Sequence, residues 1–300
     1  MEAVPRLPML WVQLRKSPEG TSFVKLKKYI GEIYQEDPEA YSKDCYALET
    51  LRNTAMHPEK SSDGIAVLKR YYCQLHSLTN RFPKSISRNL FTFTWTEKYS
   101  NTTMEYSDIK YEMASVLFNI GALHSQVGAS VQRTDVDGMK LACTHFQCAA
   151  WCFTELKDRF GTIINSEDFI SEELLMFMQQ ISFAQAQECI LEKSLIDNRK
   201  PNIVAKVTAQ IINYYNTGMS ALIAAKDKVK DNASLTKLIF FTEGKDFRFH
   251  QEFSLLQNVN VLCKHFNCLD TKPGRIKKTT FSSFVTWWVL LISIYRFFHN

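Results

Sequence analysis

The stretch from residue 167 to residue 196 is predicted to form a long helix with apolar side chains on two sides of its axis. At about 100° per residue, one broad arc contains five of them: Leu174, Met178, Ile181, Leu191 and Leu195. A second stripe contains Phe183, Ala186 and Ile190. A helix that packs against a single neighbour needs only one apolar face, so the second stripe needs a partner of its own.

The next predicted helix, residues 202–224, follows Pro201 and is also apolar over a wide arc. One edge of the arc contains Ile203, Val207 and Tyr214, and the other contains Val204, Ile211 and Tyr215. Either both edges are buried between helical layers, or one edge stays open and serves as a docking surface. The pattern alone favours burial on both sides, because that is the commoner cause of a helix that is apolar all round.

The rest of the chain is also mostly helical in pattern. Only ten glycines and eight prolines occur in 300 residues, and further helices are predicted over 23–35, from 38 to about 56, from 62 onward, over 106–129 and over 135–159. Residues 89–97 alternate aromatic side chains with threonines, so they are predicted to form a strand that pairs with the extended residues 6–16. The helix pairs, rich in Ala, Cys and Gly, predict a mainly α solenoid or extended bundle.

Composition and motifs argue against several classes of protein. The net charge of +5 is mild and spread along the chain, which does not favour nucleic-acid binding. The eight cysteines lie mostly within helical patterns, and prolines interrupt the N-terminus, so we expect reduced thiols in a cytoplasmic protein rather than a secreted one. The sequence lacks the common nucleophile, nucleotide-binding and metalloprotease motifs, and we expect neither enzymatic activity nor a cofactor.

A cluster of potential metal ligands comprises His145, Cys148 and Cys152, which a single helix face could present together. Structural zinc sites usually draw their ligands from two separate segments. Small, soft side chains of this kind also occur where two helices pack closely. We therefore predict no metal site here.

The C-terminal residues raise the question of a membrane anchor. Residues 281–298 form an apolar run preceded by a basic patch, and the uncharged stretch from Thr279 to Tyr295 is at the short end for a bilayer span. The tryptophans lie at the centre of the run, which is less typical of an interfacial belt. A membrane anchor and a buried core helix both stay open as interpretations of 279–300.

A resemblance to a known family is carried by four stretches: FTFTWTE, DIKYEMASVLFNIGALHSQVGA, GMKLACTHFQCAA and AQAQECILEKSLIDNRKPNIVAKVTAQIINYY. They resemble the Bro domain family, the endosomal sorting scaffolds that include Alix, and in particular its phosphatase-linked members. The resemblance covers residues 1–235. It implies a mainly α, curved, banana-shaped domain with a tetratricopeptide-like core and a small antiparallel sheet near the N-terminal part.

The resemblance also implies a partner and a site. Family members act as non-enzymatic adaptors that bind the C-terminal amphipathic helix of charged multivesicular body proteins, which are subunits of the ESCRT filament. Aligning the motifs places the hydrophobic patch on Ile190, Ile203 and Val207 and its neighbouring lysine on Lys140. Additional docking residues are expected at Phe183, Asp137 and Tyr214. We expect a cytoplasmic protein that is recruited to endosomes and that also has the potential to bind other endosomal adaptors.

Three departures from the family pattern bear on these expectations. Val136 stands where Alix-like members carry an acidic residue, although Asp137 is adjacent. Pro201 occupies a corner where relatives carry other residues. The resemblance is predicted to stop near residue 236, which leaves a divergent segment, 236–278, and the hydrophobic tail, 279–300. The alternatives are therefore a tail-anchored membrane protein with a degenerate Bro-like part, or an inactive truncated form.

Overall fold

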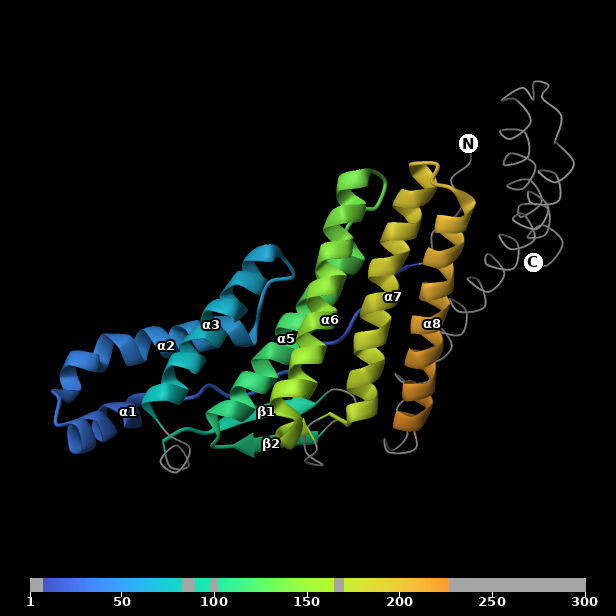
Figure 1. The fold of residues 1–300 in the computed structure, drawn as a ribbon. Coiled ribbons are helices and arrows are strands. Elements are labelled where there is room, and N and C mark those ends of the chain that lie inside the picture. The colour runs from blue at the N-terminus through green and yellow to red at the C-terminus, as the bar shows by residue number, and fades with distance from the viewer. Residues whose placement is uncertain (1–7, 83–89, 98–101, 165–169, 227–300) are drawn as a thin grey trace, which may run out of the picture. The chain divides into compact units, whose positions relative to one another are not determined.

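The chain was analysed as a computed structural model, which describes residues 8–82, 90–97, 102–164 and 170–226 (Figure 1). All of these residues belong to one of two structural units, residues 1–256. The segment 236–278 and the tail 279–300 lie outside the described residues. Among the described helices, none is both long enough and apolar enough to cross a bilayer.

Helices dominate the described part of the chain, as the sequence predicts. A short N-terminal helix α1 (Val24–Tyr29) continues into a π-helical turn (Ile30–Tyr34), and a 3-10 turn (Pro38–Tyr41) leads into the next helix. The longer elements are α2 (Ser42–Met56), α3 (Ser62–Arg81), β1 (Phe93–Glu97), β2 (Thr102–Tyr106), α5 (Ile109–Ser130), α6 (Val136–Ile164), α7 (Glu172–Ile196) and α8 (Pro201–Lys226). The mainly α class with a small antiparallel sheet is confirmed.

Local sequence signals explain where several helices begin. The side chain of Asp108 accepts a hydrogen bond from the backbone N–H of Lys110, and that of Ser171 from Leu174, so both residues act as N-caps. The cap of α3 is Ser61, whose side chain accepts a hydrogen bond from the backbone N–H of Gly64. Pro201 begins α8 at the first helical position, where its missing N–H is not needed.

The sheet differs from the prediction in its pairing. β1 pairs antiparallel with β2, from Phe93 opposite Tyr106 to Glu97 opposite Thr102. Of the extended N-terminal residues, Lys16 forms an isolated bridge to Thr96. The predicted pairing with residues 6–16 is therefore wrong as the main pairing of β1. A strand only a few residues further along the chain forms a hairpin instead, because closing a short loop loses less conformational entropy.

Helix α5 forms the centre of the domain, and its residues from Tyr111 to Ser125 are all buried. α6 packs on α5, α7 on α6 and α8 on α7, so the helices lie side by side in chain order (Figure 1). Close approach requires small residues: a Cβ added at Gly121 would lie 2.9 Å from the Cβ of Cys152. The glycine and cysteine pattern therefore reflects tight helix packing.

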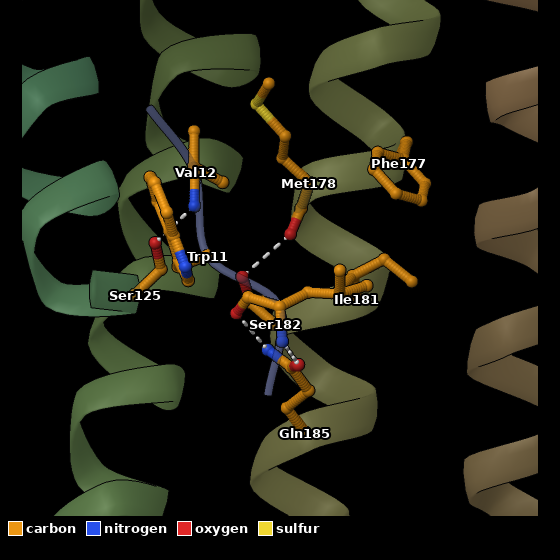
Figure 2. A pocket seen from close by; sticks show the side chains of 9 residues that line it. Trp11, Val12, Ser125, Phe177, Met178, Ile181, Ser182 and Gln185 are labelled. Atoms are coloured by element: carbon orange, nitrogen blue, oxygen red, sulfur yellow. Dashed lines mark hydrogen bonds between the residues drawn. The ribbon is translucent and has the colours of Figure 1, made fainter. Parts of the chain in front are cut away.

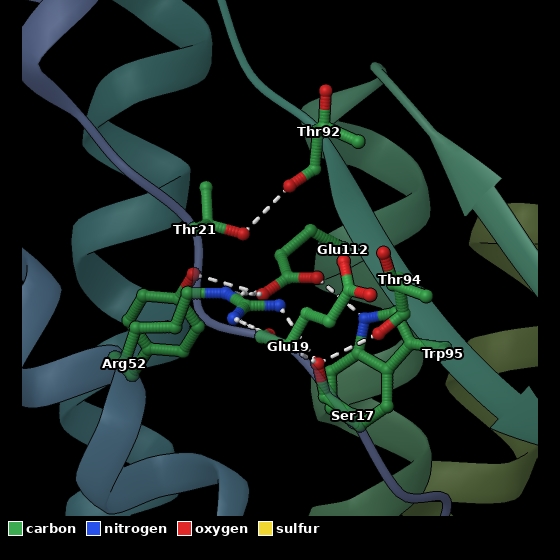
Figure 3. A network of polar contacts seen from close by, with 9 residues as sticks. Ser17, Glu19, Thr21, Arg52, Thr92, Thr94, Trp95 and Glu112 are labelled. Carbon is green, nitrogen blue, oxygen red and sulfur yellow. Dashed lines mark hydrogen bonds and ion pairs between the residues drawn. The ribbon is translucent and has the colours of Figure 1, made fainter.

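A buried polar network joins the N-terminal helices to α5 (Figure 3). Glu112 Oε1 accepts hydrogen bonds from Arg52 Nε and from the Tyr71 hydroxyl, both at 2.9 Å, and Oε2 accepts one from Trp95 Nε1 at 2.5 Å. Arg52 also donates to the hydroxyl of Ser17. Because both members of the Arg52–Glu112 pair are fully buried, the network fixes how α2, α3, α5 and β1 fit together.

Candidate functional site

The predicted patch residues lie along the boundary between α7 and α8. The rings of Phe183 on α7 and Tyr214 on α8 stack with centroids 5.5 Å apart and planes inclined by 23°. The two helices are antiparallel, so a step of seven residues from each ring, about 10.5 Å along the axis, brings Ile190 level with Val207. Ile203 lies one turn further on α8. We call these five residues, Phe183, Ile190, Ile203, Val207 and Tyr214, the apolar strip.

On α8, the strip residues form the more open edge of the apolar arc, whereas the other edge belongs to the core. Val204, Ile211 and Tyr215 are buried. Ile203, in contrast, is 42% exposed and Ile190 is 37% exposed, while Val207 and Tyr214 are half-buried. Burial on both sides, which the pattern alone favoured, is therefore wrong for these helices. One apolar edge faces the core, and the other is open to solvent at Ile203 while Val207 and Tyr214 pack partly against the core.

Charged side chains support α7 beneath and beside the strip. The buried Tyr215 hydroxyl donates a hydrogen bond to Glu188 Oε1. Burial first, and then the Glu188 carboxylate, raise the pKa of Tyr215 well above its ordinary value, so the phenol stays protonated and remains a donor. Arg133, which is buried in the loop between α5 and α6, pairs with Glu192 Oε2 at 3.1 Å. This ion pair joins that loop to the C-terminal half of α7.

Lys140 lies near the start of α6. Because the loop that precedes α6 is joined to Glu192, Lys140 is at the same end of the helical layer as Ile190 and Ile203. Its Nζ atom pairs with Asp137 Oδ1 at 3.2 Å, and both side chains are exposed. Asp137 thus partners the lysine although Val136 occupies the family's acidic position. An exposed pair of this kind contributes little to stability, so Lys140 can exchange Asp137 for a carboxylate of a ligand.

Two exposed residues at the end of α7 were not predicted. Leu195, which the sequence placed on the broad apolar arc, is 52% exposed, and Ile196 is 48% exposed. The helix ends here because Asn198 adopts a left-handed conformation with φ of 52°. The polar stretch that begins at Asp197 was the signal of a helix end, where side chains project past their neighbours. These two residues expose apolar surface next to the α7–α8 turn.

Two members of the histidine and cysteine cluster, His145 and Cys152, are part of the core, and Cys148 is half-buried. His145 is buried, and its Nδ1 atom lies 3.0 Å from Nδ1 of His124 on α5. Cys152 is also buried, and burial raises the pKa of its thiol to about 12. Within the described residues no group of three or more His, Cys, Asp or Glu side chains is arranged to hold a metal ion. The cluster is explained by helix packing.

Comparison with known proteins identifies the fold. A family model described as a BRO1-like domain matches residues 9–268, and this match includes part of the segment 236–278. Mouse tyrosine-protein phosphatase non-receptor type 23 is 41% identical over 223 residues, which make up 74% of this chain and 13% of that protein. The ALG-2 interacting protein X of Dictyostelium discoideum is 36% identical over 209 residues, 68% of this chain and 26% of that protein.

A solved structure agrees with these relatives. The structure described as an ALIX BRO1 CHMP4C complex matches with a TM-score of 0.77 and 25% identity, over 86% of this chain and 75% of that one. Fold and site define a mainly helical domain whose helices stack in chain order and present an apolar strip. The chain belongs to the BRO1-like domain family. It spans about an eighth to a quarter of the lengths of the two relatives described above.

Proposed function

We propose that this chain is a non-enzymatic adaptor that binds an amphipathic helix on the apolar strip. The proposed ligand is the C-terminal helix of a charged multivesicular body protein, a subunit of the ESCRT filament. One observation carries the proposal: Ile203 and Ile190 are exposed apolar side chains on the adjacent helices α8 and α7. The solved relative supports it, because that structure is a complex of an ALIX BRO1 domain with CHMP4C.

The spacing of the strip suits a helical ligand. The Phe183–Tyr214 level and the Ile190–Val207 level are seven residues apart, about two helical turns. A ligand helix that lies along the boundary of α7 and α8 meets both levels with side chains at i and i+7, which is the pattern of helix-in-groove recognition. Burying each aliphatic anchor contributes about 1.5–3 kcal/mol. Three or four anchors therefore supply about 5–12 kcal/mol in all, and the affinity is what remains of this sum after the cost of association.

Charge at the rim would orient the ligand. Lys140 exchanges its exposed partner Asp137 for a carboxylate on the ligand helix, which forms a charge-assisted hydrogen bond. The ligand helix is therefore expected to carry an acidic residue beside its apolar anchors. In the cell, this contact would recruit the cytoplasmic chain to endosomes, and other endosomal adaptors with a similar helix would compete for the strip.

The test is titration calorimetry of the chain with a synthetic amphipathic helix from a filament subunit. Ile203→Asp is expected to weaken binding by at least about tenfold, because a carboxylate replaces an apolar anchor. The matched control is Ile223→Asp, which changes another exposed isoleucine of α8, 53% exposed and outside the strip. Equal affinity of the two variants would show that the strip does not bind the helix.

A further inference from the structure

The first residues of the described chain are held as a bound peptide is held. We call residues 9–16 the N-terminal strap. Leu10 forms two hydrogen bonds with the side-chain amide of Gln185 on α7: its N–H donates to Oε1, and its carbonyl accepts from Nε2 at 3.0 Å. On α5, Ser125 Oγ accepts from the N–H of Val12 at 2.9 Å, and Gln126 Nε2 donates to the Val12 carbonyl at 2.9 Å.

We call each such pair of hydrogen bonds, to the N–H and the carbonyl of one residue, a clamp. A third clamp holds Arg15. Its N–H donates to Asn119 Oδ1 at 2.8 Å, and its carbonyl accepts from Asn119 Nδ2 at 3.0 Å. All three clamps contact the backbone of the strap, so they recognise an extended peptide with little regard to its side chains. Selectivity comes from burial at every third residue, the period of a polyproline II helix. Met9, Val12 and Arg15 are buried, whereas Trp11 is 49% exposed.

The strap lies between α5 and α7, on a different face of α7 from the apolar strip. Figure 2 shows Val12 against Ser125 on one side and the strap beside Gln185 on the other. Around the helix axis, Gln185 is about 160° from Phe183. Met9 packs with Ala186 and Cys189 of α7, and Ile190 follows directly. The strap and the strip therefore use the same turns of the same helix.

We propose that α5 and α7 form a binding site for an extended peptide, that residues 9–16 occupy this site in cis, and that occupancy holds α7 in the position that the apolar strip requires. The second part rests on the proposed function. The strap is thus a peptide ligand attached to its receptor, and its release weakens helix binding at the strip.

The experiment begins with the 300-residue chain, into which a protease site is inserted between the exposed residues Glu19 and Gly20. After cleavage, we expect the fragment to stay bound and to exchange with a labelled peptide of residues 1–19. With the fragment diluted away, affinity for the amphipathic helix should fall about tenfold, and saturating peptide should restore it. A fragment that leaves at once and does not rebind, or an affinity that is unchanged by its loss, would overturn the proposal.

Backbone recognition has a matched control within the peptide. N-methylation at Leu10 or Val12 removes an N–H that donates a hydrogen bond to Gln185 or Ser125. Peptides with either change should fail to rebind. N-methylation at Trp11 should be tolerated, because the described part of the chain gives no acceptor for that N–H. Equal binding of all three peptides would show that the backbone hydrogen bonds do not determine peptide binding.

A second variant covers the case in which the emptied domain unfolds. In the uncut chain, Gln185→Ala should accelerate amide exchange at Leu10 and Val12 about tenfold and weaken helix binding, whereas Gln147→Ala, an exposed glutamine on α6, should change neither. Identical exchange in both variants would refute the strap site. If the wild-type chain binds no amphipathic helix, the proposed function fails, but peptide rebinding and exchange still report on the strap.

Discussion

Ile203 and Val204 are neighbours in α8, yet Ile203 is 42% exposed and Val204 is 4% exposed. A rotation of about 100° separates the solvent-facing edge of the helix from the edge that packs against the core. This division answers why α7 and α8 are apolar over such a wide arc. One part of each arc stabilises the domain, and the other part is the proposed binding surface.

The two edges should respond differently to the same substitution. Val204→Asp places a carboxylate in the core without a partner and is expected to lower the free energy of unfolding by about 3–5 kcal/mol. Ile203→Asp is expected to stay within about 0.5 kcal/mol of the wild type, since the site is open to water. Chemical denaturation measures both. Comparable losses in the two variants would contradict the assignment of the edges.

Helix contact through glycine provides a second prediction. Gly121→Ala forces a Cβ to within 2.9 Å of the Cys152 Cβ and is expected to destabilise the fold by about 1–3 kcal/mol through overpacking. Gly161→Ala meets no atom within 4 Å, so it should be neutral or stabilise α6 by up to about 1 kcal/mol. Thermal unfolding of the pair gives the comparison, and equal melting temperatures would argue against a tight α5–α6 contact.

The buried network at Glu112 should be sensitive to loss of charge. Glu112→Gln leaves the Arg52 guanidinium buried without its carboxylate, and we expect a loss of about 3–5 kcal/mol in unfolding free energy. Glu105→Gln, at an exposed position of β2, is the control and should be silent. Urea denaturation distinguishes them. A stable Glu112→Gln variant would mean that Arg52 finds compensation elsewhere.

The paired histidines predict a dependence of stability on pH. Burial, and then the charges of Lys69 and His145, lower the pKa of His124 to about 3, and burial followed by Lys69 lowers the pKa of His145. Below pH 6.5 the unfolded chain binds protons that the folded chain does not. Stability should therefore be complete above that pH and decline towards pH 3, by roughly 2 kcal/mol between pH 6.5 and 5 from His124 alone.

Denaturation curves at pH 7.5, 6 and 5 measure this decline. His124→Gln removes the titrating imidazole and should flatten the pH dependence, whereas His76→Gln, at an exposed position on α3, should retain the wild-type slope. The same slope in all three proteins would show that the pair does not control acid stability.

Lys140 should affect how fast the ligand helix binds. Lys140→Glu reverses the charge at the rim, so the association rate and its dependence on ionic strength should both fall, while the unfolding free energy stays within about 0.5 kcal/mol. Lys43→Glu, on the exposed surface of α2, makes the same change in net charge away from the strip. Stopped-flow fluorescence measures the association rates. Equal rates for the two variants would show that Lys140 is not part of the binding site.

The helices were predictable because their apolar periodicity and their caps are local signals. The partner of β1 was not, since a five-residue strand such as Thr102–Tyr106 carries little pattern of its own and the N-terminal segment was equally extended. The open edge of α8 could be named from the family resemblance but not from periodicity, which is the same for buried and exposed isoleucines. The exposure of Leu195 was not predicted, because periodicity does not reveal where a neighbouring helix ends.

The clamp between Leu10 and Gln185 joins residues that are 175 positions apart. At the usual rates of protein synthesis, roughly 10–35 s pass between the appearance of one residue and the other. The contact between Leu10 and α7 can therefore form only after α5 and α6 have been synthesised. A nascent chain stalled before α7 is expected to hold Val12 and Arg15 on α5 but to leave Leu10 without its partner on α7.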